Sequence, residues 1–282
     1  MIDYEALRNR TFPEIRHTYE AKDTILYALG VGCGSDPDDL RFVYERDLEA
    51  LPTMAGVLCD PGFWITDPAI GADAALIVHG EQVIRLHAPL PAAGTLVGRE
   101  RIVDVVDRGR GGHAFLRTSR EIVDAHTSRP IATLASTVVL RDQGGFGGPG
   151  GSLPRRDPVP DRRPDHVMRT GTLPQAALIY RLSGDLNPLH ADPMIARQAG
   201  YPAPILHGLC TLGIAARAIL RACCGDDPAR LAEVGVRFSA PLFPGETLQS
   251  EIWRDGAIAQ FRCTALERDA VVLDCGSAAI AA

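Results

Sequence analysis

The stretch YRLSGDLNPLHADPMIARQAGYPAPILHGL, residues 180–209, decides how the rest of the chain is organised. It places a carboxylate, Asp185, and an imidazole, His190, five residues apart. A glycine and two prolines break the segment too often for one regular helix, so these side chains are expected on a loop. A loop with convergent Asp, Asn and His side chains can hold a water molecule and an acid/base pair in a fixed geometry.

An apolar run follows this loop. PILHGLCTLGIAARAILRAC, residues 204–223, is apolar on most faces, which predicts a buried helix wrapped by a sheet. At 1.5 Å per residue such a helix spans about 30 Å. The loop and the helix together form the predicted centre of the molecule.

Two short stretches recur at nearly one spacing. APLPAAGTL from Ala88 and APLFPGETL from Ala240 share five of nine residues, at an offset of 240 − 88 = 152. ILY from Ile25 and LIY from Leu178 match at an offset of 178 − 25 = 153. We infer a duplicated fold with two similar halves.

A segment without regular structure is expected between the halves. GGFGGPGGSLPRRDPVPDRRP, residues 144–164, begins with flexible glycines and continues with prolines and arginines that favour an extended path. We therefore expect an N-terminal half over 1–143, a linker over 144–164 and a C-terminal half over 165–282. A functional Gly/Pro-rich loop is the alternative for residues 144–164.

Each half is expected to combine a helix with an antiparallel sheet, which is the α+β class. Asp23 is the predicted N-cap of a helix that glycines end, and residues 1–22 are an extended lead-in. Runs rich in β-branched residues predict strands at 76–87, 95–107, 113–124 and 130–141, and at 166–173, 231–240, 247–255, 258–267 and 270–280.

The two halves are not equivalent. At an offset of 153, Asp185 falls opposite Gly32 and His190 opposite Pro37, so the first half lacks the acid/base pair. Its apolar segment from Met54 to Trp64 predicts only a short helix, which Pro61 breaks. We hypothesise that the shortened helix leaves room for a bulky ligand.

Composition bounds the class of protein. With 282 residues, 46% hydrophobic and 23% charged, the chain is globular. A net charge of −6 argues against a general nucleic-acid or membrane-surface binder. The seven cysteines lack paired CxxC spacing, which indicates reduced thiols rather than a disulfide frame or zinc site. No signal peptide or apolar membrane span is found, so a cytoplasmic protein is expected.

The stretch YRLSGDLNPLH and the following PILHGL resemble the signature of the MaoC-like, R-specific enoyl-CoA hydratases. This hydratase 2 family includes the hydratase part of peroxisomal multifunctional enzyme type 2. DTILYALGVG and APLFPGETL resemble other stretches of its two-part members. The resemblance implies a double hot-dog fold: a long helix wrapped by a curved antiparallel sheet, twice, with one catalytic site in the C-terminal half.

The same resemblance implies roles for four residues. Asp185 and His190 would form the catalytic dyad, Asn187 would support it, and the backbone N–H of Gly208 would contribute to an oxyanion hole. Adding water to an enoyl thioester requires removal of a water proton, delivery of a proton to C2, and stabilisation of charge on the thioester oxygen. A dyad supplies the first two, and a backbone N–H at a helix N-terminus supplies the third.

Each of these residues also has a structural explanation. Asp185 and Asn187 are common turn residues, and His190 can be an ordinary buried histidine. Asp192 before Pro193 is favoured as the N-cap of a helix over residues 193–198. His207 is favoured as a structural hydrogen-bonding group.

Asp192 and His207 are also weaker candidates for substrate contact, and two further residues join them. Tyr180 is equally consistent with a place in the core. Arg237 is a speculative phosphate contact for coenzyme A.

The expected ligand is an acyl-CoA thioester, and no separate cofactor is predicted. Nucleic acid and membrane are not expected partners, whereas a monomer and a homodimer are both consistent with two halves that pair their sheets. His190 and Asp192 alone are weak evidence for a metal site, so no metal is predicted. A dehydratase, a thioesterase and a non-catalytic acyl-CoA binding subunit are the alternatives.

Overall fold

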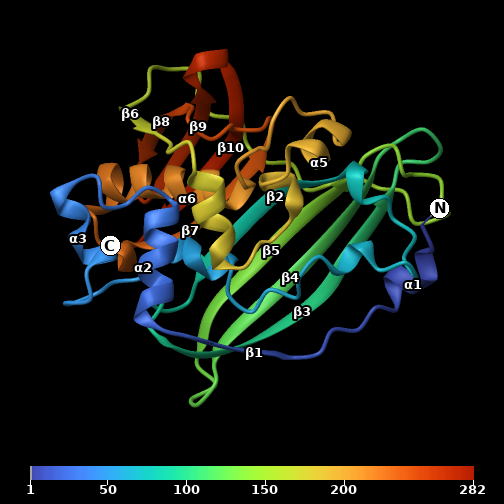
Figure 1. Cartoon of the computed structure of the whole chain (residues 1–282), viewed down its shortest axis with the longest axis horizontal. Helices are drawn as coiled ribbons and strands as arrows, with labels where there is room; N and C mark the ends of the chain where they lie inside the picture. Colours follow the sequence, from blue (N-terminus) through green and yellow to red (C-terminus); the bar gives the residue numbers. More distant parts are fainter. Residues whose placement is uncertain (1) are drawn as a thin grey trace.

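A single antiparallel sheet forms the body of the protein (Figure 1). The computed structural model describes residues 2–282, and its strand order is β1-β3-β4-β5-β2-β7-β10-β9-β8-β6. The strands are β1 (Ile15–Tyr19), β2 (Ile77–Leu86), β3 (Gly94–Asp107), β4 (Ala114–Asp124), β5 (Pro130–Leu140), β6 (His166–Gly171), β7 (Leu231–Phe238), β8 (Thr247–Asp255), β9 (Ile258–Ala265) and β10 (Ala270–Ile280). The nine strands predicted from β-branched runs are confirmed as β2 to β10.

The helices are short, apart from one in each half. They are α1 (Tyr4–Arg8), α2 (Ala21–Gly30), α3 (Leu40–Val43), α4 (Ala176–Tyr180), α5 (Pro193–Gln198) and α6 (Gly208–Ile219). Single helical turns used below are η2 (Pro52–Gly56), η3 (Trp64–Thr66), η5 (Arg181–Ser183), η6 (Pro188–His190) and η7 (Leu220–Cys224). The lead-in predicted as extended holds α1 as well as strand β1, because Asp3 caps a helical turn by accepting the Ala6 N–H.

Two predicted helix starts are wrong. Glu20, not Asp23, is the N-cap of α2, and Asp23 at the third position bonds back to the Glu20 N–H in a capping box. The central helix α6 begins at Gly208 instead of Pro204. The Leu206 N–H donates to the Leu242 carbonyl at 2.8 Å. This bond holds the residues before Gly208 in an extended path along the loop that follows β7.

The two halves join through β2 and β7, which pair antiparallel at the centre of the sheet. Two ion pairs span this joint. Arg237 lies 2.8 Å from Glu81, and Arg85 lies 2.6 Å from Glu233. The offset of 152 maps Glu81 onto Glu233 and Arg85 onto Arg237, so the two ion pairs are equivalent. The duplication inferred from the sequence is therefore present in these contacts.

The halves differ in what covers the inner face of the sheet. In the C-terminal half α6 packs on β7, β8 and β10 (Figure 1). In the N-terminal half the turn η2 packs on β2 and β5, and the chain continues through an irregular segment at Pro61 to η3. The single short helix expected over residues 54–64 is thus split into two separate turns. Part of the N-terminal sheet remains uncovered by helix.

Residues 144–164 contain no helix or strand, and they run against the sheet. The N–H groups of Gly145 and Gly147 donate to the Asp107 carboxylate at 2.7 and 3.0 Å, so the glycines anchor the segment. Further along, Arg156 donates to the Cys275 carbonyl and the Ser277 hydroxyl of β10. Within residues 2–282, no helix has the length and apolarity needed to cross a membrane.

Candidate active site

Asp185 stands at the end of a tight turn. After α4 and η5, Gly184 adopts a φ of 127°, a conformation that side-chain-bearing residues rarely adopt, and it turns the chain toward the cavity. The Asp185 carboxylate accepts the Asn187 N–H at 3.1 Å and remains exposed to solvent. The acid group is therefore fixed by its own loop and accessible to a ligand.

His190 is held in one orientation and one tautomer. Asn187 caps the turn η6 by accepting the Leu189 N–H at 3.0 Å, which positions the imidazole three residues after the cap. His190 Nδ1 lies 2.8 Å from the Ile205 carbonyl, so Nδ1 carries the proton and donates it. Nε2 then holds the free lone pair. Burial lowers the pKa of His190 below 6.5, which keeps the ring neutral at neutral pH.

His207 stacks on His190. Their ring centroids are 3.7 Å apart, and His207 Nε2 donates to the Asp185 backbone carbonyl at 3.2 Å. Its Nδ1 is buried without a hydrogen-bond partner in the described chain, and burial lowers its pKa to about 3. His207 thus links the two members of the candidate dyad. The favoured structural hydrogen bond is present, whereas the weaker candidate role of His207 in substrate contact stays a prediction.

The three polar side chains converge. One ligand-type atom from each of Asp185, His190 and His207 lies within 4.8 Å of the others. Gaps of this size allow one water molecule to bridge a carboxylate and an imidazole. The possible metal ligands in this cluster are Asp185, His190 and His207, and Asp192, which the sequence paired with His190, is not one of them.

Gly208 is the first residue of α6, and its backbone faces the same cavity. The N-cap residue His207 makes no side-chain hydrogen bond to the first turn, so the positive end of the helix is open to a ligand. A Cβ at Gly208 would lie 3.1 Å from the Phe238 ring. Only glycine leaves this close approach free.

The cavity around these groups has a volume of about 800 Å³ and is shared by both halves. From the C-terminal half it is lined by the candidate dyad, Gly208 and Phe238. From the N-terminal half it is lined by η2, the segment through Pro61, and residues of β2 to β5. The uncovered part of the N-terminal sheet is thus one wall of the chamber.

His79 is a site residue that the sequence did not indicate. It lies in β2, its ring centroid is 4.7 Å from that of Phe238, and it lines the cavity. Burial lowers its pKa to about 4. The strand prediction located His79, but only the pairing of β2 with β7 brings it beside the C-terminal half.

Four candidate residues are not among those that line the cavity: His207, Asp192, Tyr180 and Arg237. Asp192 caps α5 by accepting the Met194 N–H at 2.7 Å, as predicted. Tyr180 is buried in the core, 4.9 Å from the His207 ring. Arg237 alternates along β7 with the cavity-lining Phe238, so it points to the outer face, where it pairs with Glu81. The structure therefore does not bring Arg237 to the site.

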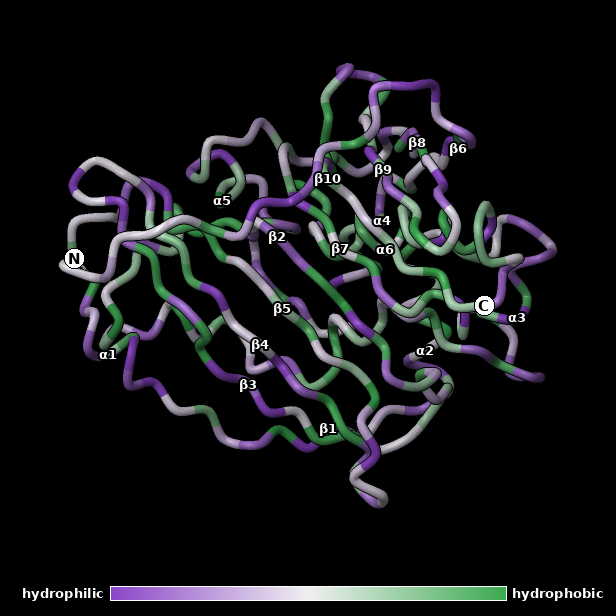
Figure 2. The backbone as a smooth tube through the Cα atoms, turned by 180° about the vertical axis from the view of Figure 1, so that it is seen from behind, coloured by the Kyte–Doolittle hydropathy of each residue, from purple (hydrophilic) through white to green (hydrophobic). Residues whose placement is uncertain are grey.

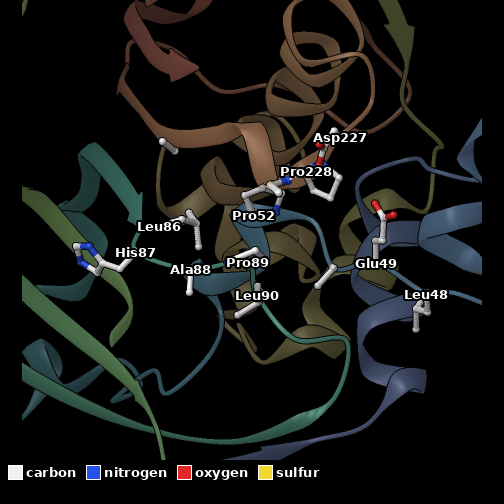
Figure 3. Close-up of a pocket in the computed structure, with 13 residues that line it drawn as sticks. Leu48, Glu49, Pro52, Leu86, His87, Ala88, Pro89, Leu90, Asp227 and Pro228 are labelled. Atoms are coloured by element: carbon white, nitrogen blue, oxygen red, sulfur yellow. Dashed lines mark hydrogen bonds between the residues drawn. The ribbon is translucent and has the colours of Figure 1, made fainter. Parts of the chain in front are cut away.

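A second, smaller pocket of about 360 Å³ lies at the related position of the duplicated fold (Figure 3). Residues 86–90 line it, and the offset of 152 maps them onto residues 238–242, which line the larger cavity. Its only histidine, His87, is set apart from Glu49 and Asp227 in Figure 3 and lies 2.8 Å from the Thr133 hydroxyl. This pocket lacks a converging acid/base pair.

Comparisons with known proteins agree with two related halves. Residues 17–142 match the MFE-2 hydratase 2 N-terminal domain, and residues 156–273 match the MaoC like domain. The chain is 44% identical to 3-hydroxyacyl-thioester dehydratase Y of Mycobacterium tuberculosis over 91% of each protein. It is 36% identical to the peroxisomal enoyl-CoA hydratase 2 of Arabidopsis thaliana over 93% of this chain and 90% of that protein.

Solved structures agree with the architecture. A MaoC-like dehydratase from Phytophthora capsici matches with a TM-score of 0.86 and 35% identity over 99% of both chains. A Mycobacterium tuberculosis protein described as having a double hotdog fold matches with a TM-score of 0.59 at 18% identity, over 96% of both chains. The predicted α+β double hot-dog fold is confirmed.

Proposed function

The chain belongs to the MaoC-like hydratase 2 family, and from this premise we propose that it is an enoyl-CoA hydratase. The proposed reaction is the reversible syn hydration of a trans-2-enoyl-CoA to an (R)-3-hydroxyacyl-CoA. The observation that carries the proposal is the convergence of Asp185, His190 and the Gly208 N–H on one cavity. The coenzyme is part of the substrate, and the reaction needs no separate cofactor.

In the proposed mechanism, one water molecule lies between the Asp185 carboxylate and His190 Nε2. The water oxygen bonds to C3 while one of its protons passes to the dyad, and the dyad returns a proton to C2. The two groups therefore finish in the protonation states in which they began. Because water and proton reach the double bond from one side, the addition is syn.

The negative charge that develops on the thioester oxygen is stabilised by the Gly208 N–H at the start of α6. The acyl chain extends into the part of the cavity formed by the N-terminal half. In the C-terminal half the related space is filled by the longer helix α6.

The dyad is tested by substitution. Asp185→Asn and His190→Ala are each expected to lower kcat for crotonyl-CoA hydration by about 10²- to 10⁴-fold, the range for loss of a positioned acid or base. Asp192→Asn is the matched control, because Asp192 lies two residues from His190 but caps α5. A near wild-type rate for either dyad variant, with product resolved by enantiomer, would contradict the assignment.

Metal independence is a second prediction. Activity is expected to survive exhaustive chelation, because proton transfer and a backbone donor meet all three chemical needs. The assay is hydration rate before and after dialysis against a strong chelator, with zinc re-addition as the control. A loss that zinc reverses would instead assign Asp185, His190 and His207 as metal ligands.

Assays with the same substrates distinguish the hydratase from the alternative functions. Dehydration of a 3-hydroxyacyl thioester uses the same groups in reverse, and one relative is named as such a dehydratase. Release of free thiol from an acyl-CoA would indicate a thioesterase. Absence of any turnover across a panel of chain lengths would indicate a binding subunit.

A further inference from the structure

The N-terminal wall of the cavity carries a polar row. Thr118 of β4 pairs with Ser136 of β5, and Ser136 pairs with Gln82 of β2. All three line the cavity. A row of hydroxyl and amide groups thus crosses the floor of the proposed acyl chamber, where an unsubstituted acyl chain would offer only hydrocarbon.

The equivalent row in the other half is apolar. In the C-terminal sheet Ala259 pairs with Ala278, and Ala278 pairs with Val234. These three residues are at most 2% exposed and belong to the core that includes α6. The two rows occupy the same positions of the duplicated fold. The offset of 152 maps Gln82 onto Val234, and the strand partners of these two residues then correspond: Ser136 to Ala278, and Thr118 to Ala259.

The neighbouring pair differs in the same way. Glu100 and Arg120 are paired across β3 and β4, and both line the cavity. The equivalent pair across β8 and β9 is Ile252 and Phe261, both fully buried. The polar residues are therefore found in the half whose sheet lines the cavity, and the equivalent positions of the other half are apolar. Figure 2, which views the sheet from behind, shows hydrophilic and hydrophobic residues mixed along β3, β4 and β5.

The hydrogen-bonding state of the polar row leaves capacity for a ligand. The Ser136 hydroxyl donates to the Gln82 side chain at 2.8 Å, and the Gln82 amide donates to the Val83 carbonyl at 2.9 Å. The Ser136 oxygen can still accept. The Thr118 hydroxyl has no hydrogen-bond partner among residues 2–282, so it can donate and accept toward the cavity.

Arg120 is committed to the protein. It donates to Glu100 at 2.9 Å, to the Leu58 carbonyl at 3.1 Å, and to Asp60. One guanidinium beside two carboxylates leaves this corner of the chamber with negative charge. A carboxylate at this corner is therefore disfavoured, and the polar group that the row accommodates there is uncharged.

From the polar row and its apolar counterpart, we propose that the enzyme prefers enoyl-CoA substrates with a neutral oxygen group, a hydroxyl or a ketone, distal on the acyl chain. The oxygen would bond to Thr118 and Ser136. This inference rests on the proposed hydratase function and specifies its substrate class.

The test compares pairs of trans-2-enoyl-CoAs of equal chain length, with and without a hydroxyl group, the hydroxyl being moved along the chain from C6 to C12. We expect kcat/KM at the best hydroxyl position to exceed that of the plain chain about tenfold, the effect of one well-formed hydrogen bond. Thr118→Val is expected to remove the preference, measured as the ratio of kcat/KM between the two members of each pair. Ser136→Ala is expected to reduce the preference for the hydroxylated substrate.

Thr264→Val is the matched control, because Thr264 lies in β9 and does not line the cavity. The control should retain the full preference. Equal kcat/KM for both members of every pair, with normal hydration of plain chains, overturns the inference and leaves the hydratase function in place. Absence of hydration for all substrates overturns the hydratase function itself.

Discussion

The neutral state of His190 follows from its surroundings. The ring is 8% exposed, stacks on His207, and donates its Nδ1 proton to the Ile205 carbonyl. Desolvation disfavours the charged imidazolium, so the pKa lies below 6.5. The nearby Arg181 lowers the pKa further, whereas Asp185 raises it. A base of this kind remains available in mildly acidic solution.

The pH profile tests this state. In the proposed mechanism His190 acts with a neutral ring, so kcat/KM for hydration should be flat through neutral pH and fall as pH drops through the lowered pKa, at a value under 6.5. Arg181→Gln should move this acid limb to higher pH, because a positive charge near the ring is removed. The measurement is kcat/KM from pH 4.5 to 8. An acid limb at or above 6.5 in the wild type would contradict the burial argument.

At the scale of elements, the start of α6 determines where the proposed oxyanion hole lies. The helix begins at Gly208 because the preceding residues are held extended against the loop after β7. Phe238, at the end of β7, occupies the space beside the Gly208 Cα. Helix start and strand end therefore form one wall of the site, and neither is placed by local propensity alone.

Gly208→Ala tests this arrangement. The new methyl group would lie 3.1 Å from the Phe238 ring and in the path of the thioester, so kcat/KM should fall at least about tenfold, while stability changes little because Ala favours helix by about 1 kcal/mol. Hydration kinetics and urea unfolding measure the two effects. The double variant Gly208→Ala/Phe238→Leu should remain slow. Full recovery would show that the ring contact alone caused the loss.

At the scale of the molecule, both halves contribute buried histidines to one cavity. His79 from the N-terminal half and His190 from the C-terminal half line it, and His207 stacks on His190. Burial lowers the pKa of His79 to about 4 and that of His207 to about 3, against 6.5 for an exposed ring. Between these values the unfolded chain binds protons that the folded chain does not.

The free energy of unfolding should therefore fall as pH decreases from 6.5 toward 4. Each such histidine contributes a slope of about 1.4 kcal/mol per pH unit in this window. Urea unfolding at a series of pH values measures the slope. His79→Gln should reduce it, whereas His126→Gln, an exposed exchange, should not. An unchanged slope in the His79 variant would contradict the linkage.

The sequence by itself determined the strands β2 to β10 and the loop that carries the candidate acid/base pair. β-branched runs predicted strands β2 to β10, turn residues bounded them, and the repeated APL motifs indicated two halves. Asp185, Asn187 and His190 lie within six residues of one loop, so their association is local and visible in the chain. These features depend on neighbours in sequence, which propensity and patterning describe well.

Only the tertiary structure decided which distant groups share the cavity. The pairing of β2 with β7 brings His79 to the site and turns Arg237 to the outer face. The stacking of His207 on His190 and the polar row with Thr118 likewise depend on contacts between segments far apart in the chain. A strand pattern predicts alternation but not which face meets the cavity, because that is set by long-range pairing and by the helix that one half lacks.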